Sequence, residues 1–135
     1  MIIDSNNRDT LHLLPFSDYW FKGFSYEYDA DTLTVALQDQ SESKQFHLIF
    51  HQTVLFRMQS CNPWGKGNAV YDLTYQEDSP LLTLLQQVKS DNQVNIDKSK
   101  LDNEVDYLCL SVCLNSGDEL LIVCENVEIV CDNAI

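Results

Sequence analysis

The sequence predicts one α+β domain that is mainly antiparallel β: a meander sheet or two packed sheets of about six strands with one helix. Two kinds of pattern support this class. Several segments alternate apolar and polar residues with a period of two, and turn residues separate these segments. One other segment has apolar residues at helical spacing. The 135 residues suit a single domain with one core, in which residues 1–18 are only weakly patterned.

The most regular pattern predicts a β-hairpin over residues 24–38. Polar turn residues at 29–32 separate two alternating runs, whose apolar members are Phe24, Tyr26, Tyr28, Leu33, Val35 and Leu37. With a two-residue loop, Tyr28 lies opposite Leu33, and all apolar side chains fall on one face. We therefore expect this face to be buried.

A third strand is predicted after a polar turn at residues 39–44. Apolar residues of one parity continue from Phe46 to Met58, and Gln52 interrupts them, which indicates a bulge or bend in one long strand. Together with the hairpin, this strand forms a meander. The six residues that we predict to be core are Phe24, Tyr26, Leu33, Val35, Leu48 and Phe50.

The helix and the last strands are predicted downstream. Ser79 and Pro80 suit a helix start, and leucine and valine follow at helical spacing over residues 81–88. Residues 104–115 and 119–125 form two strands joined by a turn, and residues 127–131 extend or kink the second. Apolar residues line both faces of the first of these strands, so we expect it to be central and covered on both sides.

The charge of the chain is strongly negative. There are 21 acidic residues against 8 basic ones, a net charge of -13, and eight acidic residues but no Lys or Arg follow Lys100. Such a surface repels nucleic acid and anionic membranes and suits a basic protein partner. The first residues lack the pattern of a secretory signal, and no apolar run is long enough for a membrane helix, so we expect a cytoplasmic protein.

Cysteine and histidine do not form a recognisable metal or redox motif. The odd number of five cysteines, without a C-x-x-C pair, predicts reduced thiols that fill the core. With a two-residue loop in the last hairpin, Cys109 and Cys124 lie opposite each other, and Cys113 shares their face. His47 and His51 share a strand face, but their α-carbons are about 13 Å apart in an extended strand. We therefore expect no metal and no cofactor.

Residues 61–68 form a loop rich in glycine and proline around Trp64. The loop lacks the spacing of a phosphate-binding loop. Trp64 either anchors a binding partner or folds back to close one end of the core. No serine–histidine–aspartate or cysteine–histidine motif is present, so we expect no catalytic residues.

Three segments, residues 46–50, 68–73 and 120–129, resemble small bacterial domains of unknown function. Some of these domains are thought to be immunity proteins of polymorphic toxin systems, and the resemblance covers residues 19–130. It is consistent with a non-enzymatic protein-binding module, in its specific form an immunity-type inhibitor of a basic protein partner. The partner-binding residues that we expect are Trp64, Lys66, Asp118, Glu119, Glu125 and Glu128. The alternative is a small-ligand-binding or accessory enzyme domain with a cleft near Trp64 and His47.

Overall fold

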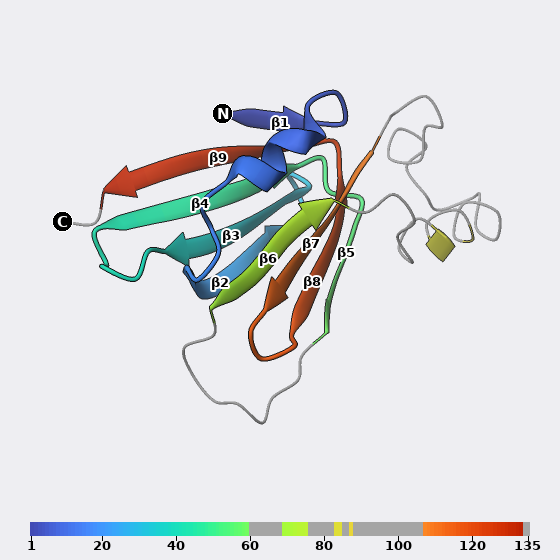
Figure 1. Cartoon of the computed structure of the whole chain (residues 1–135). Helices are drawn as coiled ribbons and strands as arrows, with labels where there is room; N and C mark the ends of the chain where they lie inside the picture. The colour runs from blue at the N-terminus through green and yellow to red at the C-terminus, as the bar shows by residue number, and fades with distance from the viewer. Residues whose placement is uncertain (60–68, 76–82, 85–86, 88–106, 134–135) are drawn as a thin grey trace.

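A computed structural model of the chain describes residues 1–59, 69–75, 83–84, 87 and 107–133 (Figure 1). They form two antiparallel sheets. The five-stranded sheet has the order β1 (Ile2–Asp4), β9 (Asn126–Asn133), β4 (Lys44–His51), β3 (Thr32–Gln38) and β2 (Trp20–Glu27). The four-stranded sheet has the order β5 (Leu55–Gln59), β8 (Glu119–Cys124), β7 (Leu108–Leu114) and β6 (Val70–Tyr75).

The architecture is mainly antiparallel β, as the sequence predicts, but it does not match the α+β class or the count of about six strands. The described residues form nine strands and a short 3-10 helix, η1 (Arg8–Leu13). The helix predicted over residues 81–88 lies largely outside the described residues, in which Thr83, Leu84 and Gln87 are helical. The strand count is higher because two segments predicted as single long strands each divide between the two sheets.

The β2–β3 hairpin has the predicted faces but a different register. Tyr26 lies opposite Leu33 and Phe24 opposite Val35, so the pairing is two residues away from the predicted one. The turn holds four residues rather than two, because Asp31 adopts a left-handed conformation with φ 50° and donates its N–H to the Tyr28 carbonyl at 3.4 Å. A shift of two residues keeps every side chain on its face.

The predicted core residues of β3 and β4 are confirmed. Leu33, Val35, Leu48 and Phe50 are each 0% exposed. Tyr26 packs partly buried against them. Phe24 is 41% exposed, so its prediction as a core residue is wrong. The reason is position: β2 is the outermost strand of its sheet, and a bulge lies between Phe21 and Gly23.

The segment predicted as one long strand changes sheets at Gln52. β4 pairs with β9 in the five-stranded sheet, and β5 pairs with β8 in the four-stranded sheet. Gln52 has φ 52°, so the predicted bend is present and separates two strands. The partner ribbon changes sheets at Glu125, between β8 and β9. Figure 1 shows β4 and β9 running side by side and continuing into β5 and β8. Such corners are typical of sheets that pack at a steep angle.

The last hairpin corrects the predicted thiol arrangement. Its loop has three residues, with φ 93° at Gly117, and the Gly117 N–H donates to the Leu114 carbonyl at 3.0 Å. Cys124 therefore pairs with Leu108, and Cys109 pairs with Val123. This shift by one position places Cys109 and Cys124 on opposite faces of the sheet.

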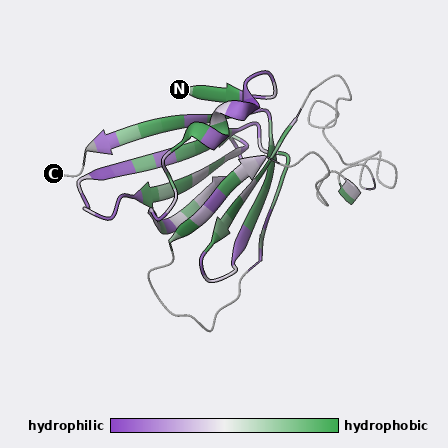
Figure 2. Ribbon diagram, in the orientation of Figure 1, coloured by the Kyte–Doolittle hydropathy of each residue, from purple (hydrophilic) through white to green (hydrophobic). Residues whose placement is uncertain are grey.

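β7 is central and buried on both faces, as predicted. Its inner side chains join the main core, which lies between the two sheets. On the outer face, Cys109, Leu121 and Val123 form a second buried cluster. Figure 2 shows that apolar residues concentrate in the strands and hydrophilic residues in the turns.

Candidate functional site

Two of the predicted partner-binding residues, Trp64 and Lys66, lie outside the described residues. Their chain neighbours on either side lie beside the β7–β8 turn: Gln59 pairs with Glu119, and the Asn115 N–H donates to the Ala69 carbonyl at 2.9 Å. Asp118, in the same turn, is only 7% exposed. Gln59 and Ala69, the described residues on either side of this segment, thus lie next to the turn that holds Asp118.

Glu119 is part of a small polar cluster on the outer face of the four-stranded sheet. The Ser111 hydroxyl lies 3.2 Å and the Cys113 thiol 3.5 Å from its Oε2 atom. Burial raises the pKa of the Cys113 thiol, and the negative charges of Glu119 and Asp72 raise it further. A thiol with a raised pKa stays protonated at neutral pH, so Cys113 is a poor nucleophile.

Glu125 and Glu128 lie at the opposite end of β8. Six residues of extended chain separate Glu125 from Glu119, a distance of about 20 Å. The Glu125 N–H donates to the His51 carbonyl at 3.1 Å, and the Glu128 carboxylate lies 3.0 Å from Nε2 of His51. The structure therefore divides the predicted acidic residues into two separate groups, one at each end of this strand.

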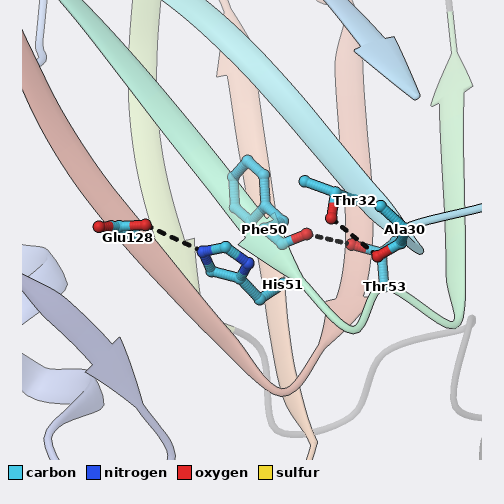
Figure 3. A network of polar contacts seen from close by, with 6 residues as sticks. All are labelled: Ala30, Thr32, Phe50, His51, Thr53 and Glu128. Atoms are coloured by element: carbon cyan, nitrogen blue, oxygen red, sulfur yellow. Dashed lines mark hydrogen bonds and ion pairs between the residues drawn. The ribbon is translucent and has the colours of Figure 1, made fainter. Parts of the chain in front are cut away.

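The β2–β3 turn brings further carboxylates to the end that holds Glu125. The Thr53 N–H, next to the sheet-switching residue Gln52, donates to the Asp31 carbonyl at 2.8 Å. The Thr53 hydroxyl, buried at 1% exposure, donates to the Phe50 carbonyl at 2.8 Å (Figure 3). The bond to Asp31 attaches the turn to the corner, and the bond to Phe50 lies within the corner itself. We call the carboxylates gathered there the acidic corner: Glu27, Asp29, Asp31, Glu125 and Glu128.

Four aromatic rings form a continuous row beside the acidic corner, and we call Phe24, Tyr26, Tyr28 and Phe56 the aromatic row. The Tyr26 ring lies 4.9 Å from the Tyr28 ring and 4.9 Å from the Phe56 ring, and the Phe24 ring lies 6.1 Å from the Phe56 ring. Tyr28 is 83% exposed and Phe24 41%. The Tyr26 hydroxyl is 3.5 Å from the Asp31 carboxylate. The row thus contains two exposed rings, and its partly buried Tyr26 lies next to one carboxylate of the acidic corner.

From the sequence, we expected the inner face of β2 to be buried, because its aromatic residues alternate with polar ones in the same way as the apolar residues of β3. One signal separates the two strands: the inner positions of β2 are aromatic, whereas those of β3 are Leu33, Val35 and Leu37. Aromatic residues with a polar atom are common at partly exposed edges, whereas Leu and Val fill the middle of a core.

The two histidines of β4 each pair with their own carboxylate. Nδ1 of His47 lies 3.0 Å from the Asp132 carboxylate, and His51 contacts Glu128 on the same outer face. Each pair joins β4 diagonally to β9. Within the part of the chain that the structure describes, no three His, Cys, Asp or Glu side chains are grouped as a metal site would require.

Described residues line a hollow beside His47 and another beside η1. A shallow hollow of about 320 Å³ beside His47 is formed by Lys22 and by small residues of β2 and β3. A smaller one, of about 120 Å³, is lined by His12, Ser17 and Asp72 among others. The Ser17 hydroxyl donates to the Tyr71 carbonyl at 3.2 Å. It does not contact His12 or Asp72, so these three residues do not form a catalytic triad.

Comparison of the chain with protein-family models and with curated proteins finds no match. In the described ranges, no helix is long and apolar enough to cross a membrane.

Proposed function

We propose that this chain is a non-enzymatic protein-binding module whose partner presents a basic surface. The observation that carries the proposal is the exposed ring of Tyr28, which packs against Tyr26, whose hydroxyl lies 3.5 Å from the Asp31 carboxylate. Glu27 and Asp29 flank Tyr28 in the sequence. Tyrosine is enriched among the residues that dominate protein interfaces, and a ring with an exposed fraction of 83% has no role in the core.

The acidic corner and the aromatic row together suit arginine and lysine side chains. A guanidinium or ammonium group can lie over the ring of Tyr28 while it pairs with a neighbouring carboxylate. The acidic corner also increases the association rate of a basic partner and repels nucleic acid. Glu125 and Glu128, expected from the sequence as contact residues, belong to the same end of the molecule.

The specific form of this function is an immunity-type inhibitor that binds a basic protein in the cytoplasm. The resemblance of residues 19–130 to small bacterial domains supports this form, as does the excess of acidic residues. In this proposal Glu119, at the far end of β8, also contacts the partner, and so do Trp64 and Lys66, which lie outside the described residues. Asp118 is 7% exposed and has little surface to contribute.

The alternative, a ligand-binding or accessory enzyme domain, has less support. Its cleft is predicted near Trp64 and His47; the shallow hollow described above lies beside His47, whereas Trp64 lies outside the described residues. Asp39, Cys113 and Cys124 have shifted pKa values, and none of these three lines this hollow or the smaller one. Perturbed groups in a concave pocket are the usual mark of an active site.

Retention of a partner from the lysate of the source cell tests the proposal. The immobilised wild type is compared with a corner variant that carries Glu27→Gln, Asp29→Asn and Asp31→Asn. Asparagine tolerates the left-handed conformation at position 31, so the turn is preserved. The control variant carries Asp18→Asn, Glu42→Gln and Asp132→Asn, which remove the same charge at the other end of the five-stranded sheet.

We expect a basic protein that the wild type and the control variant retain at low salt. The corner variant and a Tyr28→Ser variant should lose it, and so should the wild type near 1 M salt, at which the screening length is about 3 Å. Recovery of nucleic acid, or equal retention by the corner and control variants, would contradict the proposal.

A further inference from the structure

The outer edge of β2 is open. From Phe21 to Glu27 this strand pairs with β3 on one side, and no described strand pairs with its other side; only Trp20 forms a bridge, to Ala69. Side chains of both faces are exposed here, since Phe24 points inward and Ser25 and Glu27 point outward. The backbone groups along this edge are therefore accessible to another extended chain.

The other edges are shorter or obstructed. β1 has three residues, and β5 has five with the exposed cation Arg57 at its centre. Along β6, the Ser17 hydroxyl donates to the Tyr71 carbonyl and the Asp18 N–H to the Val70 carbonyl at 2.8 Å. β2, with eight residues, is thus the longest accessible edge in the described structure.

The surroundings of this edge offer places for side chains on both faces. On the inner side, an added strand would cover the exposed Phe24 ring and the ring of Phe56 behind it. On the outer side, Gly23 has φ 136° and open space where a Cβ would lie. Gly23, Ser25, Thr34 and Ala36 form the floor of the hollow of about 320 Å³. A long side chain from the added strand fits over this floor.

We propose that the partner adds an extended, basic segment to the edge of β2 as a further antiparallel or parallel strand. This inference rests on the proposed function and specifies how the partner binds. Main-chain hydrogen bonds would supply affinity, and the aromatic row and the hollow would select alternate side chains. The basic residues of the segment lie near Glu27, Asp29 and Asp31, because Lys22 repels them at the other end of the strand.

A second copy of the chain is the competing occupant of the edge. Antiparallel pairing of two β2 strands places Lys22 of each copy near Glu27 of the other. The net charge of -13 on each copy opposes this association, whereas it favours a basic segment. Charge complementarity therefore favours a basic strand from a partner over a second copy of the chain.

The test uses a synthetic eight-residue peptide of alternating lysine and valine, blocked at both ends. Its control is the same peptide with every backbone nitrogen methylated, which keeps the charges but removes the N–H donors. Binding of both peptides to the wild type and to the corner variant is followed by titration, and amide hydrogen exchange of the protein is recorded with and without peptide.

We expect the unmethylated peptide to bind at least about tenfold more tightly than its methylated control, and to slow exchange at alternate amides of β2. Equal binding of both peptides, no binding of either, or protection only away from β2 would overturn strand addition. If both peptides bind equally to the wild type but more weakly to the corner variant, strand addition is rejected, whereas the proposal of a basic partner is retained. A dimer in sedimentation that Phe24→Lys dissociates would assign the edge to a second copy and overturn the inference.

Discussion

Replacement of Leu48 by alanine tests the location of the core most directly. Leu48 is 0% exposed, lies in a central strand and pairs with Val35 on one side and Ile129 on the other. Truncation of a buried leucine costs about 2–5 kcal/mol, and we expect about 3 kcal/mol here because the neighbouring strands hold the cavity open. For a chain of 135 residues, this corresponds to a decrease of about 10 °C in Tm.

The matched control is Ile49→Ala, one position along the same strand. Ile49 points to the outer face and is partly exposed, so its truncation should cost about 1 kcal/mol. Urea denaturation followed by circular dichroism gives both free energies of unfolding. Equal losses, or a larger loss for Ile49→Ala, would refute the assignment of the inner face of β4.

Two other predictions concern the corner and the thiols. Thr53→Val removes the buried bond to the Phe50 carbonyl and should lower the free energy of unfolding by about 1–2 kcal/mol, whereas Thr53→Ser, which keeps the hydroxyl, should retain most of it. Chemical denaturation of both variants checks this, and equal losses would count against the bond. Cys131 is exposed and should react quickly with an aromatic disulfide reagent, so Cys131→Ser should remove one fast-reacting thiol. Cys124 is buried, and burial raises the pKa of its thiol, so it should react only on unfolding; rapid labelling in the native state would show that its inner position is wrong.

The faces of the strands could be predicted from the sequence, but their registers could not. The alternation of Leu33, Val35 and Leu37 identifies a buried face whatever the turn length, because a two-residue slip preserves the face. Register depends on the turn. Asp31 and Gly117 adopt left-handed conformations that lengthen their loops, and the type of turn depends on contacts with distant residues such as Thr53.

The sequence also could not predict that the segment over residues 46–58 divides between two sheets. The inner parity continues from Phe50 to Phe56 across Gln52, so the apolar pattern does not reveal that the chain changes sheets. Both parts face the same core from opposite sides, and burial alone is compatible with one bent strand or two separate ones. The identity of the pairing strand resolves this, and for both β4 and β5 the strand that decides it, β9 or β8, is at least 60 residues away in sequence.

The acidic residues of the candidate site could be identified individually but not grouped. Asp118, Glu119, Glu125 and Glu128 follow one another in sequence, and the excess of negative charge after Lys100 suggested one surface. An extended strand separates its two ends, so β8 carries Glu119 away from Glu125. The other carboxylates at the same end of the sheet come instead from the β2–β3 turn, nearly 100 residues earlier, because β3 pairs with β4 and β4 pairs with β9.

The attachment of this turn to the corner bears on binding as well as on folding. A free surface turn would lose conformational entropy when a partner orders it, and this loss weakens binding. Here the Thr53 N–H holds the Asp31 carbonyl, and the Thr32 hydroxyl donates to the Ala30 carbonyl at 2.9 Å (Figure 3). The backbone of the turn that carries Tyr28 and Asp31 is therefore positioned before the partner arrives. Since Thr53 lies where the chain changes sheets, its hydrogen bond to Asp31 connects the proposed binding surface to the point at which β4 leads into β5.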